Sequence, residues 1–286
     1  MKTAKKIWLI VGAVCTVLGI GIMSVTLFFI LRSGGLEALQ TIDSDHVPKA
    51  VTLTEDFDSI AVSAVSEDIT LRLSESGEPV VEYFESRLLT YEIKISDGTL
   101  NIIAEDQSHW YDHIGVSFGV QKHGMVITLP KAQYDRLTVH ETSGDLTVPA
   151  GFTFSSAEIQ TVSGEVNWRA AVRDDFSALT VSGDICLQNA LPGAMVELKT
   201  TSGNVRFSNG EAQQVTVKTV SGDVAFADCD TQRVNITSVS GDITAAFATP
   251  KSIKASSVSG EIQVKDDPTA SSTCTVTTTS GDITIH

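Results

Sequence analysis

The sequence predicts an all-β protein whose second half is a β-solenoid, a stack of short parallel strands wound in similar turns. The main observation is that Ser-Gly followed by Asp, Glu or Asn recurs eight times, with successive glycines 19–21 residues apart. A fixed period of this length is typical of a repeat array. The repeats are also rich in Val, Ile and Thr, which favour strands. The repeated glycines are Gly144, Gly164, Gly183, Gly203, Gly222, Gly241, Gly260 and Gly281.

Apolar residues occupy four fixed positions in every repeat. Counted from the repeat serine as zero, positions −6, −4, +3 and +5 are apolar in all eight copies. A spacing of two predicts strands with one buried face. The change from even to odd positions across Ser-Gly predicts a corner there, where glycine avoids a Cβ clash. Each repeat therefore forms one rung, and about eight rungs fill residues 137–286. The rungs must stack, because a single rung cannot fold alone.

Residues 53–136 are predicted to form a degenerate rung followed by a β-rich cap. Phe57–Leu73 resembles a rung with Glu67 in the place of the glycine. Four later segments alternate between apolar and polar residues as strands do, and Asp97-Gly98 between two of them is typical of a two-residue hairpin turn. The four segments are Val80–Glu85, Tyr91–Ile95, Thr99–Ala104 and Met125–Leu129. Such a segment can supply the cap that the end of a repeat array requires.

The other end of the array has no such cap in the sequence. The chain stops five residues after Gly281, at His286. An open C-terminal rung would leave backbone N–H and C=O groups unpaired. We therefore expect either a loop that covers this rung or another chain that pairs with it, a second copy of this chain included.

Residues 1–32 are predicted to be a cytoplasmic tip and a single transmembrane helix. Ile7–Leu31 is a run of 25 residues without charge, long enough to span a bilayer. Three lysines precede the run, so the positive-inside rule places the N-terminus in the cytoplasm and the repeats outside the cell membrane. A cleaved signal peptide is the alternative, but its apolar region is usually shorter. Residues 33–52 are expected to be a juxtamembrane linker.

Charge limits the partners of the part that follows the apolar segment. The first 32 residues carry four basic groups and no acidic ones, which leaves 16 basic and 35 acidic residues and a net charge of −19 for the remainder. A surface of this sign repels nucleic acid and attracts cations and cationic peptides. Acidity that only keeps an exposed β-rod soluble is the alternative explanation.

The most distinctive candidate for ligand contact is the loop segment His109, Trp110, Tyr111, Asp112 and His113. Its aromatic rings could contact a carbohydrate or a cell-wall polymer, and its histidines could bind zinc. Without a helix, however, a spacing of four does not place His109 and His113 on one face. An exposed loop with incidental histidines explains the segment equally well. We assign no metal or cofactor site.

Two other patterns suggest chemistry at first reading. Gly115-Val116-Ser117-Phe118-Gly119 matches the nucleophile elbow of hydrolases, with Asp135 and His140 following in the right order. The elbow requires a strand, a sharp turn and a helix, and here a strand is expected after the motif in place of the helix.

Position +2 of the repeat is a carboxylate in seven copies and Asn204 in the eighth. A turn accepts this mixture of residues more readily than a calcium site does. We therefore predict no catalytic residue and no enzyme.

These features together resemble a bacterial family. The single N-terminal apolar segment, the Trp-containing insertion, the Leu129-Pro130 step and the serial units of the type Thr180–Ile185 are similar to the putative-adhesin β-strand-repeat family, domain of unknown function 4097. Some members resemble Lia-type surface proteins of the envelope-stress response. The resemblance covers roughly residues 53–286 and implies a non-enzymatic exported protein without defined catalytic residues.

Two functional hypotheses follow. The first is a membrane-anchored, extracytoplasmic protein that acts by binding, as an adhesin or an envelope-stress component. The second is a structural scaffold that associates end to end through the C-terminal rung, as bactofilin-type solenoids do.

Overall fold

The computed structural model describes residues 46–75, 77–86, 88–106 and 124–286. The described residues from Val47 onward belong to one compact unit. This unit contains 22 strands, and no helix long and apolar enough to cross a membrane occurs in the described part of the chain. The predicted membrane segment lies outside the described residues. The prediction of a linker over 33–52 is wrong at its end, because residues 47–52 form a strand that pairs within the unit.

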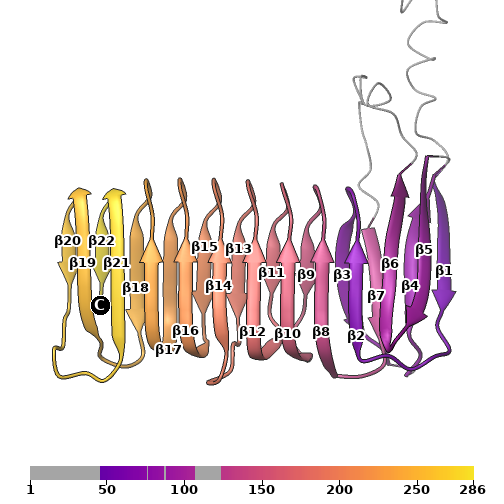
Figure 1. Ribbon diagram of the computed structural model, residues 1–286, viewed down its shortest axis with the longest axis horizontal. Coiled ribbons are helices and arrows are strands. Elements are labelled where there is room, and N and C mark those ends of the chain that lie inside the picture. The colour runs from indigo at the N-terminus through magenta and orange to yellow at the C-terminus, as the bar shows by residue number, and fades with distance from the viewer. Residues whose placement is uncertain (1–45, 76, 87, 107–123) are drawn as a thin grey trace, which may run out of the picture. The chain divides into compact units, whose positions relative to one another are not determined.

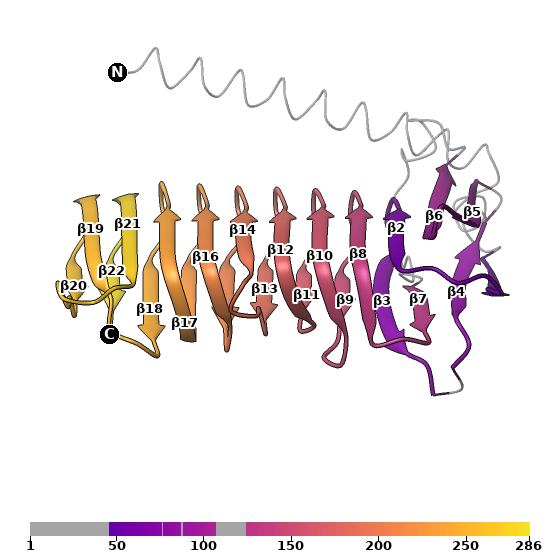
Figure 2. The ribbon, with the colours of Figure 1, turned by 60° about the horizontal axis from the view of Figure 1, so that its bottom comes forward.

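The strands form two ladders, here called sheet A and sheet B, that run the length of the unit (Figures 1 and 2). Sheet B has the spatial order β5 (Leu89–Ser96), β6 (Thr99–Asp106), β2 (Ser59–Ser63), β8 (Gln133–His140), β10 (Thr153–Gln160), β12 (Ala171–Leu179), β14 (Met195–Lys199), β16 (Glu211–Lys218), the second half of β17 (Val224–Thr237), β21 (Thr273–Ser280) and β19 (Ser252–Ser259).

Sheet A has the order β1 (Val47–Thr52), β4 (Val80–Glu85), β7 (Gly124–Leu129), β3 (Asp68–Leu73), β9 (Leu146–Val148), β11 (Val166–Trp168), β13 (Ile185–Gln188), β15 (Val205–Ser208), the first half of β17, β18 (Ile243–Phe247), β22 (Ile283–Ile285) and β20 (Ile262–Val264). From β7 and β6 onward, every pair is parallel. The prediction of an all-β, mostly parallel fold is confirmed.

The core lies between the two sheets at the four predicted positions. Side chains at −6, −4, +3 and +5 are at most 3% exposed in seven of the eight repeats. Equivalent positions stack directly on one another: Val166 pairs with Leu146 on one side and with Ile185 on the other. This stacking buries all four side chains of a rung, each worth roughly 1.5–3 kcal/mol. The exceptional repeat contains β19 and β20.

The corner between the sheets requires glycine for a reason that differs from the predicted one. A Cβ on Gly183 would overlap the carbonyl oxygen of Gly164, and a Cβ on Gly203 would overlap that of Gly183. The glycines are thus needed because adjacent rungs approach closely at the corner. The buried hydroxyl at position −2 supports the same corner, since Thr200 Oγ1 accepts a hydrogen bond of 3.0 Å from the N–H of Gly203.

The N-terminal end of the unit confirms the degenerate rung and the β-rich cap. A Cβ on Gly144 would overlap the carbonyl oxygen of Glu67, so Glu67 stands in the glycine's place. Strands β2 and β3 of this rung lie between β8–β9 and β6–β7. Beyond them, β5 pairs antiparallel with β6, and Asp97 and Gly98 turn the hairpin with φ of 51° and 70°. Antiparallel β4 and β1 extend sheet A in the same way.

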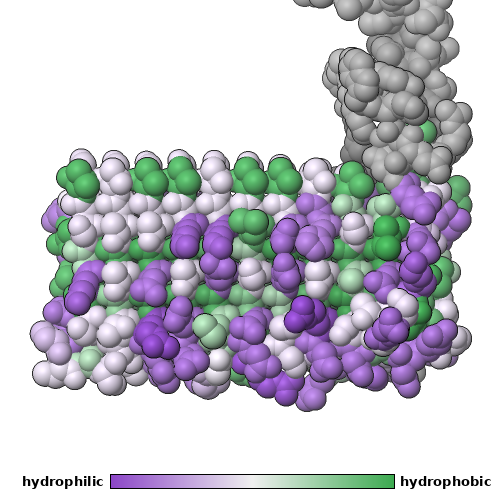
Figure 3. Space-filling model, in the orientation of Figure 1, coloured by the Kyte–Doolittle hydropathy of each residue, from purple (hydrophilic) through white to green (hydrophobic). Residues whose placement is uncertain are grey.

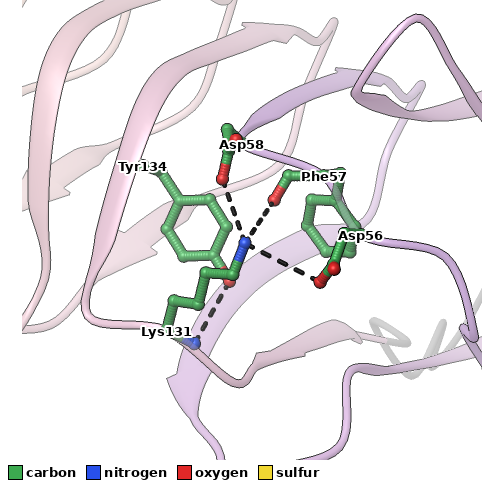
Figure 4. A network of polar contacts seen from close by, with 5 residues as sticks. All are labelled: Asp56, Phe57, Asp58, Lys131 and Tyr134. Carbon is green, nitrogen blue, oxygen red and sulfur yellow. Dashed lines mark hydrogen bonds and ion pairs between the residues drawn. The ribbon is translucent and has the colours of Figure 1, made fainter.

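Aromatic side chains fill the core near this end. The rings of Phe57, Tyr134 and Phe154 stack with centroids 5.9 Å apart, and Trp168 lies 5.3 Å from Phe154. Above the stack, Lys131 Nζ donates to Asp58 Oδ1 at 3.0 Å and lies 3.8 Å from Asp56, as Figure 4 shows. Both carboxylates are exposed, so these pairs add little stability. They join the loop before β2 to the loop before β8.

The C-terminal end overturns one prediction. The last strand, β22, pairs with β18 on one side and with β20 on the other, so the C-terminal rung lies inside the stack. Figures 1 and 2 place the C-terminus beside β22, with β19 and β20 beyond it. The glycine order agrees, because a Cβ on Gly281 would meet Gly241 and a Cβ on Gly260 would meet Gly281. The open rung is therefore β19–β20, and association through the C-terminal rung is wrong.

The inner place of β21–β22 buries its core side chains. Its inward residues Cys274, Val276, Ile283 and Ile285 are at most 2% exposed. The connection over residues 265–272 is long enough to return the chain past the β19–β20 rung. Ile262 and Val264 of that outer rung remain 40% and 37% exposed.

Candidate functional site

The sequence-predicted ligand contacts, His109 to His113, lie outside the described residues, as does the Gly115–Gly119 motif. The partners proposed for that motif are described. Asp135 and His140 are both exposed on β8. Five residues of extended strand separate them by about 16 Å, so they cannot form a hydrogen-bonded acid–histidine pair. The geometry of β8 therefore gives a hydrolase no support.

The outward carboxylates at position +2 form a continuous ladder along the corner, which we call the acid ladder. Its members are Asp68, Asp145, Glu165, Asp184, Asn204, Asp223, Asp242, Asp282 and Glu261 in spatial order. One side-chain oxygen of each Asp, and of Asn204, accepts the N–H of the +2 residue in a neighbouring rung, at distances of 2.7–3.0 Å. This bonding explains why an amide can replace a carboxylate. It also orients the negative charge toward solvent along the corner.

A row of exposed apolar side chains runs beside the acid ladder, at position −1. Val162, Val181, Val220 and Val239 are 44–47% exposed and Val258 is 83% exposed, with threonines in the other three repeats. We call the five valines the valine row. Figure 3 shows it as a broken line of hydrophobic residues along one edge of the stack. The sequence carried this signal, since position −1 is Val or Thr in all eight copies, but the core pattern gave no reason to consider it.

A shallow groove of about 360 Å³ lies on the outer face of sheet B. Acidic, basic and apolar side chains from β8, β10, β12 and β14 line it, among them Arg136, Glu158, Asp175, Met195 and Glu197. Lys199 Nζ pairs with Glu197 at 2.6 Å. The groove thus has excess negative charge and one exposed methionine, and it is too open to exclude water from a reaction.

The three cysteines of the described residues all have raised thiol pKa values. Burial raises the pKa of Cys229 to about 11 and that of Cys274 to about 12, so both remain thiols at neutral pH. Burial also raises the pKa of the half-buried Cys186. Within the described ranges, no three His, Cys, Asp or Glu side chains are placed to hold a metal ion. Three exposed features of the described residues are candidate sites, namely the acid ladder, the valine row and the groove.

Known structures share this fold. A crystal structure described as a putative adhesin from Bacteroides fragilis NCTC 9343 matches with a TM-score of 0.55 and 16% identity, over 85% of this chain and 98% of that chain. A structure described as a putative lipid binding protein from Parabacteroides distasonis ATCC 8503 matches with a TM-score of 0.54 and 16% identity, over the same shares. At this identity the likeness concerns the fold alone. No curated protein matches the chain.

The family assignment rests on a separate comparison. The family profile described as Toastrack DUF4097 matches residues 57–286, which include the degenerate rung, the cap strands β4 and β5 and all eight Ser-Gly corners. This range agrees with the predicted resemblance over residues 53–286. The chain belongs to the Toastrack DUF4097 family.

Proposed function

We propose that this chain is a non-enzymatic, membrane-anchored extracytoplasmic binding protein, an adhesin or envelope-stress component, and that its solenoid captures cationic, amphipathic partners. The observation that carries the proposal is the pairing of two parallel rows on one corner. The acid ladder offers negative charge at every rung except that of Asn204, and the valine row beside it offers exposed apolar area. An elongated partner with one basic and one apolar stripe matches both rows.

Charge and relatives support this proposal from different directions. The net charge of −19 after the apolar segment concentrates cations near the surface. Anionic lipid is disfavoured for the same reason, although one structural relative carries a lipid-binding description. The other is described as an adhesin, which is a binding function without chemistry. The uncharged segment Ile7–Leu31, with the lysines before it, supports a membrane anchor whose N-terminus lies in the cytoplasm.

The test uses the full chain in detergent and a basic amphipathic helical peptide, titrated at low and at physiological salt. A triple variant, Asp184→Asn, Asp223→Asn and Asp242→Asn, removes three charges from the acid ladder but keeps every acceptor, as Asn204 does naturally. We expect affinity to fall about tenfold in this variant, because each adjacent charge contributes on the order of 1 kcal/mol or less.

The matched control removes three exposed charges elsewhere through Glu55→Gln, Glu75→Gln and Glu78→Gln. We expect this variant to lose much less affinity than the acid-ladder variant. Equal losses in the two variants would mean that only net charge matters. Binding that ignores salt in the unmodified chain would rule out an electrostatic mechanism altogether.

A further inference from the structure

The outermost rung, β19–β20, has an open edge in both sheets. Strand β19 pairs with β21 and β20 pairs with β22, and neither has a second partner among the described residues. The inward side chains Ile253, Ala255, Ile262 and Val264 are partly exposed, whereas their equivalents in the other repeats are buried. Within the described part of the chain, the core thus ends in an uncovered apolar face, framed by two strand edges.

The direction of the free backbone groups is fixed by the bonds on the other side. Ser252 donates its N–H to Ser272, so the even residues of β19 face β21 and Ile253, Ala255 and Ser257 face outward. Glu261 accepts from Ile283 and Lys265 donates to Ile285, so the odd residues of β20 face β22. Ile262 and Val264 therefore direct their backbone groups outward. The N–H of Ile253 is already bonded to Asp266 Oδ1 at 2.7 Å.

A single twofold axis can satisfy both edges. Ala255 and Gln263 stand four residues before and four residues after the corner serine, Ser259, and so lie at the same height in the two sheets. A twofold axis that is perpendicular to the sheets, and passes between each of these residues and its copy, makes each strand antiparallel to its copy. Ala255 then exchanges two hydrogen bonds with Ala255 of the second copy. The N–H of Ser257 donates to the carbonyl oxygen of Ile253 in the second copy. In sheet A, Ile262 pairs with Val264 in the same way.

The same axis also brings opposite charges together. In sheet A it places Glu261 opposite Lys265 of the second copy, and Lys265 opposite the second Glu261. Both side chains are exposed on the outer face of the sheet. In sheet B it places Lys254 opposite Ser256 of the second copy. The two copies of Lys254, a residue type that discourages pairing at strand edges, therefore do not face each other. Inward residues remain inward, because the register is centred on a residue in each strand.

We propose that this chain forms a head-to-head dimer in which β19 and β20 each pair antiparallel with their copies and join two solenoids into one continuous pair of sheets. The occupant of the open edge is a second copy of this chain, because one axis satisfies the backbone direction, the side-chain facing and the charges of both strands. This dimer is closed at the joined ends, so it does not extend into a filament. It does not depend on the cationic partner proposed above.

Disulfide trapping tests the axis in the full chain within cell membranes. The background carries Cys15→Ser and Cys186→Ser, which leaves only the buried Cys229 and Cys274. Gln263→Cys places a thiol on the axis in a non-hydrogen-bonded pair, with Cα atoms about 4.5 Å apart, within the range of a disulfide. We expect mild oxidation to convert most of this variant to a covalent dimer on a non-reducing gel.

The matched control is Thr284→Cys, which pairs with Gln263 one rung further in. The Cα atoms of the two introduced cysteines would lie about 14 Å apart, which is too far for a disulfide. We therefore expect this variant to remain monomeric on the gel. Adding Lys265→Glu to Gln263→Cys should lower the dimer yield at least about fivefold, because two carboxylate pairs then face each other. Adding Glu261→Lys as well should restore it. Equal yields for the Gln263 and Thr284 variants, or a charge reversal without loss and rescue, would overturn this dimer.

Discussion

At the scale of single residues, the repeat glycines of the described rungs leave no room for a side chain. Their constraint comes from the neighbouring rung, since the carbonyl oxygen of one glycine occupies the space where the Cβ of the next would be. The acid ladder follows the same logic, because each aspartate bonds a backbone amide one rung away. A substitution at either position therefore acts on two rungs at once.

The Gly203→Ala variant should lose about 3 kcal/mol or more of unfolding free energy, because the new methyl group forces two rungs apart at the corner. Chemical denaturation followed by circular dichroism measures the loss. Gly193→Ala is the control, since its Cβ would lie 3.3 Å from the carbonyl oxygen of Arg173 and needs only a small shift. Similar stability of the two variants would contradict the corner stacking.

Lys251 is the one lysine that the structure buries fully among the described residues. Its ammonium donates to the carbonyl of Thr231 at 2.6 Å and lies 4.9 Å from the ring centre of Phe247. Burial lowers its pKa below the ordinary value. In the pH range between the lowered pKa and the ordinary pKa of 10.5, the unfolded chain binds more protons than the folded one. Stability should therefore rise with pH in this range.

The Lys251→Met variant lacks the titrating ammonium group. Its stability should therefore not show the rise with pH that the lysine causes. Replacing a buried charge by an apolar side chain of similar length is also expected to be neutral or stabilising at neutral pH. Thermal melting of both proteins between pH 7 and 10.5 measures the difference in stability between them at each pH. Groups that titrate in both proteins contribute equally and drop out of this difference. A constant difference over the whole range would contradict a lowered lysine pKa.

At the scale of elements, each rung is a unit that depends on its neighbours. The strands of a rung are three to nine residues long, apart from β17, and the hydrogen bonds of interior rungs run to the rungs on either side. A defect in an interior strand therefore removes pairing partners in both directions.

Val217→Asp should unfold several rungs together. Val217 is fully buried in β16 between β14 and β17, and an unpaired buried carboxylate costs several kcal/mol. Limited proteolysis should then cut within the neighbouring rungs. The control, Lys218→Asp, changes an exposed residue of the same strand and should melt like the unmodified protein. Normal melting of Val217→Asp would contradict the assignment of inward positions.

At the scale of the whole molecule, the two ends of the described unit differ. The N-terminal end finishes in antiparallel strands, and Pro48 and Lys49 in β1 are residues that discourage further pairing. The opposite end finishes in the open rung β19–β20. This asymmetry explains why dimerisation is expected at one end only.

Membrane topology is the remaining prediction at this scale. Protease added to intact cells should remove the repeat domain and leave the segment Ile7–Leu31 in the membrane, because the positive-inside rule predicts a cytoplasmic N-terminus from the lysines before it. Immunoblots with tags at either end measure this, with a cytoplasmic protein as the control for intact cells. A soluble mature form that begins near Leu36 would instead identify a cleaved signal peptide.

The sequence by itself determined the all-β class, the inward positions, the corners and the degenerate rung. These features are local, because a period of two within strands and a recurring Ser-Gly are visible without knowing which rungs touch. The hairpin at Asp97-Gly98 is local in the same sense, since both residues adopt the left-handed backbone that this turn requires. The valine row was equally visible, but periodicity does not distinguish an exposed apolar position from a core position.

Only the tertiary structure decided the order of the rungs. Rungs with the same inward pattern can stack on either neighbour, so the sequence does not state that β21–β22 lies inside β19–β20. That order requires a connection long enough to return the chain past a rung, and residues 265–272 supply it. It moved the open edge from the C-terminus to residues 252–264, and with it the surface through which two copies can pair.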